Sequence, residues 1–271
     1  MQLQNARARF QKQGIGLAAI SYDSEAILQD FAKRKHIEYS LLADPDSHVI
    51  KRFHVLNAKA DGMTRGMAFP GYVFVDRNGV IREKFFESEY AYRFTANNVV
   101  ANLFPELTEE AGKKIEAAHL GLALTQSDQT VIAGSRVSLF VEVTLPPDTH
   151  VYAPGAQGYK PVALVLQPSP DVQLEPPRYP SPKILYLDAI KEKVPVFERR
   201  FRIAEDVKIA ATEALFKSLG SSGKTISVAG EFHYQACDQK MCYLPTSVPV
   251  SWQLHVVPLD VERSPAAIRH K

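Results

Sequence analysis

Residues 225–257 read TISVAGEFHYQACDQKMCYLPTSVPVSWQLHVV, and this stretch decides the fold of the second part of the chain. Apolar and polar side chains alternate at both of its ends, as in antiparallel strands with one buried face. The segment between the ends carries Cys237 and Cys242, the only two cysteines in 271 residues. The pattern predicts a hairpin whose tip holds both thiols, and it places the single Trp252 in the core.

The strand pattern extends upstream from this hairpin. RVSLFVEVTL at 136–145 alternates in the same way, and PVALVLQ at 161–167 and VPVFERRFRI at 194–203 also read as strands. Fifteen of the 18 prolines fall in residues 108–271, and proline is excluded from helix interiors and central strands. Many short strands with frequent turns predict an all-β antiparallel sandwich.

Residues 1–107 hold only three prolines and alternate helical and strand patterns. We expect a helix at the start and a strand buried on both faces in GIGLAAISYD at 14–23. A helix over 23–36, capped by Asp23 or Ser24, and a short helix over 44–55 follow. An Asn-Gly turn at 78–79 predicts a hairpin over 71–87, and Thr95 is the expected N-cap of a closing helix. The order predicts an α/β domain.

The boundary between the two parts lies in FPELTEEAGKKIEAAHL at 104–120. Thr108 is a plausible N-cap, and acidic residues followed by lysines suit a short charged helix. We therefore predict an α/β domain over 1–104, a helical linker over 105–118, a β-sandwich over 119–258 and a C-terminal tail over 259–271.

Composition excludes several classes of partner. The net charge is +2, which is too small to indicate a nucleic-acid partner. No apolar run reaches 18 residues, so we expect no membrane insertion. The first residues lack the apolar segment of a secretory signal, and no motif indicates a cofactor.

Three interpretations of the cysteine pair follow from the residues themselves. A structural disulfide in so short a loop would contribute only about 2 kcal/mol. A metal site with His233 or His255 lacks the usual C-x2-C spacing and two further ligands. A reversible dithiol would have Lys240 favouring a thiolate and Asp238 opposing it, so local charge leaves all three interpretations open.

AFPGYVFVDRNGVI at 68–81, in its helix–strand order, resembles the thioredoxin fold and more closely its AhpC/TSA peroxiredoxin branch. The resemblance implies that Pro70 is the proline that is commonly cis beside the redox cysteine in such folds. No cysteine precedes Cys237, and the first strands and the start of the redox helix are missing. We therefore expect a thioredoxin-like domain truncated at its amino terminus, without peroxidase chemistry of its own.

The segments HVYAPGAQGYKPVALVL at 150–166, SPKILYLDAIKEKVPV at 181–196 and YQACDQKMCYLPTSVPV at 234–250 resemble the N-terminal periplasmic domain of thiol:disulfide interchange protein DsbD. The resemblance implies an immunoglobulin-like sandwich whose redox pair is Cys237 and Cys242. It also implies an aromatic shield in the segment around Tyr186, and a bacterial location outside the cytoplasm. The residues expected to line the pair are Tyr234, Gln235, Tyr243 and Pro245.

These resemblances predict a thiol–disulfide oxidoreductase, with Cys237 as the exchanging residue. The expected partner is a thioredoxin-like protein, a membrane thiol–disulfide exchange protein or a peroxiredoxin-type domain. The alternative is a non-catalytic β-sandwich binding module with a structural disulfide.

Overall fold

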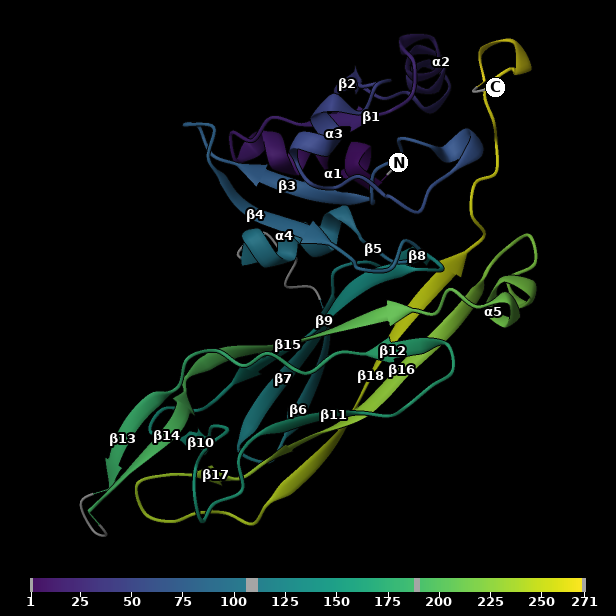
Figure 1. The fold of residues 1–271 in the computed structure, drawn as a ribbon. Coiled ribbons are helices and arrows are strands. Elements are labelled where there is room, and N and C mark those ends of the chain that lie inside the picture. Colours follow the sequence, from purple (N-terminus) through teal and green to yellow (C-terminus); the bar gives the residue numbers. More distant parts are fainter. Residues whose placement is uncertain (1, 106–111, 188–190, 270–271) are drawn as a thin grey trace. The chain divides into compact units, whose positions relative to one another are not determined.

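A computed structural model describes residues 2–105, 112–187 and 191–269. The chain divides into two compact units (Figure 1). Unit 1 comprises Met1–Leu103 with Leu259–Lys271, and unit 2 comprises Phe104–Pro258. No helix among the described residues has the length and apolar character needed to cross a bilayer.

Unit 1 has the predicted alternation of helices and strands. The first helix, α1 (Gln2–Lys12), is amphipathic and buries Ala6 and Phe10. Both predicted N-caps form: Ser24 accepts a hydrogen bond from the Ile27 amide at the start of α2 (Glu25–Lys35). Thr95 accepts one from the Asn98 amide at the start of α4 (Ala96–Leu103). The elements are α1 (Gln2–Lys12), β1 (Ala18–Ser21), α2 (Glu25–Lys35), β2 (Ser40–Ala43), α3 (His48–Arg52), η1 (Gly62–Thr64), β3 (Gly71–Val75), β4 (Ile81–Phe86), β5 (Arg93–Phe94), α4 (Ala96–Leu103) and η3 (Ala266–Ile268).

The strands of unit 1 differ from the expectation in one respect. The strand β1 is not buried on both faces, since Ile20 is 41% exposed. It forms a two-stranded parallel sheet with β2, a strand too short for its sequence pattern to reveal. The predicted hairpin forms separately as the antiparallel pair β3 and β4.

The prediction of a cis bond at Pro70 is wrong, because no peptide bond in the described residues is cis. Pro70 instead stands immediately before β3, where a proline removes no ladder hydrogen bond. A trans bond is the ordinary state there, since only about 5–6% of X-Pro bonds in folded proteins are cis.

The segment predicted as a C-terminal tail contacts α2 within unit 1. Lys35 pairs with Asp260 at 2.6 Å and with Glu262, and Arg34 pairs with Glu262 at 3.3 Å. Water and salt screen surface ion pairs of this kind, so we assign them a role in orienting the segment and no large contribution to stability.

Unit 2 is built almost entirely of strands. The elements are β6 (Lys113–Ala117), β7 (Leu120–Gln126), β8 (Thr130–Ile132), β9 (Ser135–Thr144), β10 (His150–Tyr152), β11 (Ala163–Leu166), β12 (Val172–Leu174), β13 (Lys183–Leu187), β14 (Glu192–Glu198), β15 (Arg200–Ile209), α5 (Glu213–Ser218), β16 (Lys224–Tyr234), β17 (Ala236–Cys237) and β18 (Thr246–Val257). The strands form three sheets with the orders β12-β15-β9-β7-β6, β11-β16-β18-β8 and β13-β14-β10-β17.

Two expectations for this part are corrected. The helical linker over 105–118 is wrong for Lys113–Ala117, which form β6 and pair with β7, while Thr108 lies outside the described residues. The sandwich is not wholly antiparallel either, since β8 pairs with β18 in parallel.

The core of unit 2 lies between the first two sheets. The predicted inward face of β9 is confirmed, since Val137, Leu139, Val141 and Val143 are fully buried. Trp252 is in the core as expected, and its Nε1 donates a 2.8 Å hydrogen bond to the Thr125 carbonyl.

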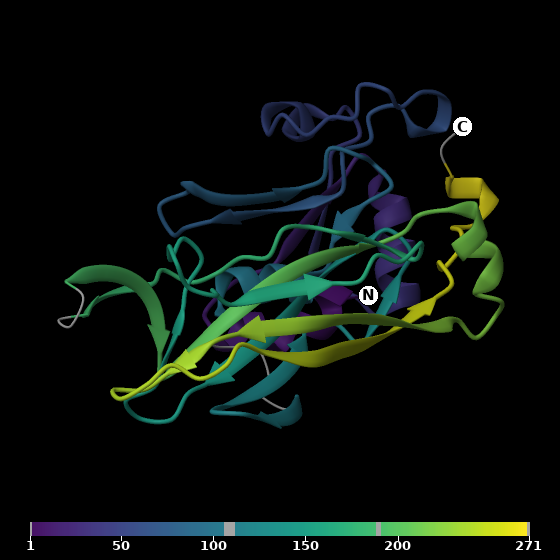
Figure 2. The ribbon, with the colours of Figure 1, turned by 90° about the horizontal axis from the view of Figure 1, so that it is seen from below.

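The hairpin of β16 and β18 positions the cysteine loop. The two strands pair without interruption from Lys224 opposite Val256 to Tyr234 opposite Thr246. They form a long ribbon in both views (Figures 1 and 2). The loop at its end contains β17, which pairs with β10. The third sheet, which contains β10 and β17, therefore meets the hairpin at the loop that carries both cysteines.

Candidate functional site

The cysteine loop is a small hairpin of its own. Cys237 and Cys242 form a disulfide with their Cα atoms 4.0 Å apart. The Asp238 amide donates to the Met241 carbonyl at 3.0 Å, and the Tyr243 amide donates to the Ala236 carbonyl at 2.9 Å. Backbone hydrogen bonds therefore close the loop on both sides of the disulfide.

Asp238 holds the turn of this loop. Its carboxylate accepts hydrogen bonds from the Tyr243 hydroxyl at 2.6 Å and from the amides of Lys240 and Met241. These bonds, the one from Tyr243 first, lower the pKa of Asp238 to about 2, because each favours the ionised carboxylate. The same contact raises the pKa of Tyr243. Tyr243 in turn stacks on His119, with 3.5 Å between the ring centres.

The two sulfur atoms lie in different surroundings. Cys237 is 1% exposed and packs with Tyr152, Val194 and Val196 in a cluster beneath the loop. Cys242 is exposed. A partner thiolate can therefore approach Cys242 more readily than Cys237.

Tyr152 joins the disulfide to the third sheet. Its hydroxyl lies 3.4 Å from Cys237 Sγ and 3.3 Å from Cys242 Sγ. The sulfurs of a disulfide carry no hydrogen, so the hydroxyl is the donor, and its single proton is shared between the two sulfurs. Burial, with a smaller contribution from Tyr159, raises the pKa of Tyr152, so the hydroxyl keeps its proton. The ring of Tyr159 stacks on Tyr152 with 4.1 Å between the ring centres.

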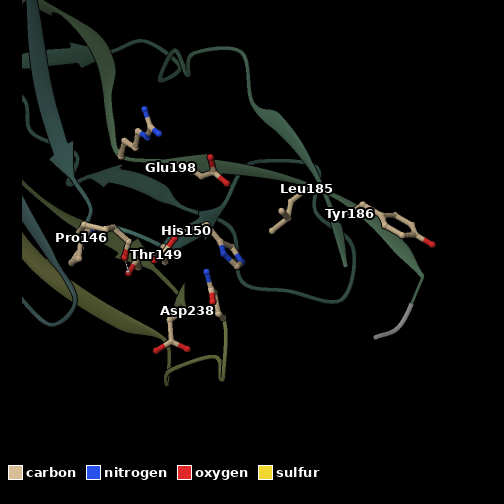
Figure 3. Close-up of a pocket in the computed structure, with 11 residues that line it drawn as sticks. Pro146, Thr149, His150, Leu185, Tyr186, Glu198 and Asp238 are labelled. Atoms are coloured by element: carbon tan, nitrogen blue, oxygen red, sulfur yellow. Dashed lines mark hydrogen bonds between the residues drawn. The ribbon is translucent and has the colours of Figure 1, made fainter. Parts of the chain in front are cut away.

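Asp238 and Gln239 of the loop also line a cavity of about 610 Å³. His150 projects into it from β10, between Glu198 of β14 and Asp238 of the loop (Figure 3). Burial lowers the pKa of His150, against the opposing charges of Glu198 and Asp238. At neutral pH the imidazole is therefore uncharged.

The residues expected to line the disulfide differ in their burial and in their contacts with the cysteine loop. Tyr234 is buried in the main core and donates to the Ala118 carbonyl. Gln235 donates to the Tyr243 carbonyl and so braces the loop. Pro245 is exposed. Tyr186 is 49% exposed on β13 and points away from His150 and Asp238 (Figure 3).

The sequence interpretation missed the two side chains of β10, His150 and Tyr152. Their signal was present in the HVYAPG segment, where two residues two apart share one face of a short strand. The expected exchange at Cys237 requires access to that sulfur, whereas the burial pattern favours Cys242.

The histidines considered for a metal site have other contacts. His233 pairs with Glu231 at 3.4 Å, and His255 contacts the Thr225 hydroxyl at 3.3 Å. Within residues 2–105, 112–187 and 191–269, no cluster of three or more His, Cys, Asp or Glu side chains could hold a metal ion.

Comparison with solved structures finds eight similar chains, among them the N-terminal domains of two proteins. The N-terminal periplasmic domain of ScsB from Proteus mirabilis is 12% identical, with a TM-score of 0.34 and coverage of 53% of this chain and 49% of that chain. The chain thus spans about half the length of that domain. The reduced N-terminal domain of DsbD from Neisseria meningitidis is 14% identical, with a TM-score of 0.29 and coverage of 44% and 82%. No curated protein matches the chain.

Two family models match separate regions. Residues 1–84 match the AhpC/TSA family, and residues 122–251 match the N-terminal domain of thiol:disulfide interchange protein DsbD. The chain therefore combines an AhpC/TSA-like, thioredoxin-like region with a β-sandwich region of the DsbD N-terminal type.

Proposed function

We propose that unit 2 carries out thiol–disulfide exchange through Cys237 and Cys242. The observation that supports this most is the asymmetry of the disulfide, with one exposed sulfur, one buried sulfur and a hydroxyl donor on both. An exchangeable disulfide needs one sulfur that a thiolate can reach and a leaving sulfur that can be stabilised as a thiolate.

The reaction follows from this geometry. A partner thiolate attacks Cys242 Sγ, the Cys237–Cys242 bond breaks, and Cys237 leaves as a thiolate. The Tyr152 hydroxyl, already donating to Cys237 Sγ, stabilises that charge. A second thiolate of the partner then attacks the partner sulfur of the mixed disulfide and releases Cys242. Two electrons pass to this pair, and the partner becomes the oxidised disulfide.

The loop does not depend on the disulfide for its shape. Three hydrogen bonds to Asp238 and two backbone bonds already close it. Because the cysteines are only five positions apart, the cross-link removes little entropy from the unfolded chain, about 2 kcal/mol at most. A structural brace is thus the weaker explanation.

The partner we propose is a thioredoxin-like protein or a membrane thiol–disulfide exchange protein. The family match to the DsbD N-terminal domain supports this assignment. For the sandwich itself we propose an immunoglobulin-like arrangement. The AhpC/TSA-like region contains no cysteine, so the exchange is assigned to unit 2 alone.

The reduction potential of the Cys237–Cys242 pair tests the proposal. Equilibration of the purified protein with thioredoxin or glutathione redox buffers, followed by alkylation and mass spectrometry, gives the oxidised fraction. We expect a potential above about −300 mV, in the range of exchanging pairs. A pair that stays oxidised below that potential would be a structural disulfide, and the binding-module alternative would replace this proposal.

A further inference from the structure

Three side chains stand in a row across the third sheet. In the antiparallel register, His150 of β10 is directly opposite Glu198 of β14 on one side and Cys237 of β17 on the other. Directly opposed residues of an antiparallel pair project from the same face, with Cβ atoms about 4.5–5.5 Å apart. One face of the sheet therefore carries a carboxylate, an imidazole and the buried sulfur of Cys237 side by side on three neighbouring strands.

The imidazole in the middle of this row has one nitrogen that makes no hydrogen bond within the described residues. His150 is 9% exposed, and its buried Nε2 has no hydrogen-bond partner among the described residues. The ring meets Tyr152 edge-on, with 5.6 Å between ring centres, and Tyr152 contacts both sulfurs. A buried polar nitrogen left without a partner is costly, so its retention beside a redox pair indicates a use in another step of the reaction.

Both acidic and basic side chains lie near the His150 imidazole. Glu198 is held by Lys183 at 2.8 Å, and Asp238 is held by its own loop. The other titratable or charged groups that face the imidazole or line its cavity are Tyr152 on its own strand, Tyr186 of β13, and Asp148 and Arg199 of the adjoining turns. The two carboxylates oppose the effect of burial on the imidazole.

We propose that His150 is the general base that deprotonates Cys237, with Glu198 as its positioning residue. The inference rests on the proposed exchange function and adds a catalytic residue to it. It concerns the direction in which the reduced pair gives up its electrons, because there the buried Cys237 thiol must lose a proton before it can react.

The step balances as follows. The Cys242 thiolate attacks a partner disulfide, forms a mixed disulfide and releases one partner thiolate. The Cys237 S–H proton passes to the His150 imidazole, and the Cys237 thiolate attacks Cys242 Sγ. The Cys237–Cys242 bond forms, the bond from Cys242 to the partner breaks, and the second partner sulfur leaves as a thiolate. The pair is oxidised by two electrons, and the imidazolium returns its proton to water.

The test uses the reduced full chain and a limiting amount of a chromogenic aromatic disulfide as the probe. Each probe molecule releases one coloured thiolate when Cys242 attacks and a second when Cys237 resolves the mixed disulfide. We expect His150→Gln to leave the first phase unchanged and to slow the second phase at neutral pH at least about tenfold. The difference should vanish at high pH, where the Cys237 thiol ionises without help.

His233→Gln is the matched control, because His233 is in the same sandwich and pairs with Glu231 instead; both of its phases should match the parent. Glu198→Gln is a second test that does not depend on the folding of His150→Gln. It removes a charge that raises the pKa of His150, so the midpoint of the pH profile of the second-phase rate should move to lower pH. A second phase with the same rate and pH profile in His150→Gln, or an unmoved inflection in Glu198→Gln, overturns the inference. A parent protein that shows no first phase contradicts the exchange function itself.

Discussion

At the residue scale, Tyr152 connects the disulfide to the rest of the protein. It is 1% exposed, its hydroxyl contacts both sulfurs, and its ring is held by Tyr159. The position of the cysteines at a hairpin tip could be predicted from the alternation in 225–257. The contact with Tyr152 could not, because strand pairing brings together residues that are 85 and 90 positions apart.

Replacing Tyr152 by Phe removes this hydroxyl and keeps the ring. We expect exchange at the pair to slow about tenfold, because the Cys237 leaving thiolate loses a donor whose hydrogen bond is worth roughly 1.5 kcal/mol. The melting temperature should change little. Stopped-flow reduction of the disulfide by a dithiol measures the rate. Tyr159→Phe is the control, since the Tyr159 hydroxyl donates to Glu192, and an equal slowing in both variants would refute this role for Tyr152.

At the element scale, β15 carries a carboxyl group on its core-facing side. Glu205 alternates with Ile203 and Val207, is 3% exposed, and has an Oε2 atom without a hydrogen-bond partner among the described residues. Burial, with a smaller contribution from Asp206, raises the pKa of Glu205 to about 7. The folded state therefore binds a proton that the unfolded chain releases near pH 4.3.

This burial predicts the sign of a pH dependence. Below about pH 4 Glu205 is protonated in both states, so it adds no pH-dependent term. As the pH rises toward 7, only the unfolded state ionises, and the free energy of unfolding should fall by on the order of 3 kcal/mol. Urea unfolding at several pH values should show that Glu205→Gln removes this decline. Glu213→Gln on α5, whose side chain is 80% exposed, should keep it. An unchanged slope in Glu205→Gln would mean that the carboxyl is already ionised.

Other elements show where sequence patterns lose information. The charged residues of Lys113–Ala117 read as part of a helix, yet they form β6, because β7 offers a pairing edge. Tertiary pairing decides the conformation of such short polar segments, and local propensity is a weak guide there. Long alternating strands such as β9, β16 and β18 were predictable, since one face of each is buried along most of its length.

At the scale of the whole molecule, the two units differ in how their strands are supported. In unit 1, β1 with β2 and β3 with β4 form separate two-stranded sheets, and Ile20 and Val75 are 41% and 42% exposed. In unit 2, β9 lies between β15 and β7 and contributes fully buried side chains to the core. The two-part division could be predicted from proline usage, whereas the sparse burial of β1 could not.

Hydrogen exchange should reveal this difference. We expect low protection for Ala18–Ser21 and Gly71–Val75, and high protection for Ser135–Thr144, because exchange follows local opening and few buried contacts resist opening in unit 1. Exchange read by peptide-level mass spectrometry compares the two units within one sample. Equal, strong protection in both would show that the strands of unit 1 are supported as well as those of unit 2.

The central claim is that Cys237 and Cys242 are an exchanging pair whose accessible member is Cys242. The most direct measurement is the trapping of a mixed disulfide between each single variant and an oxidised thioredoxin-like protein, followed by non-reducing mass spectrometry. Cys237→Ser leaves the exposed Cys242 without its resolving partner, so it should accumulate the mixed disulfide. Cys242→Ser leaves only the buried Cys237 and should form far less. Equal trapping by the two variants, or trapping by neither while both lose stability, would contradict the account.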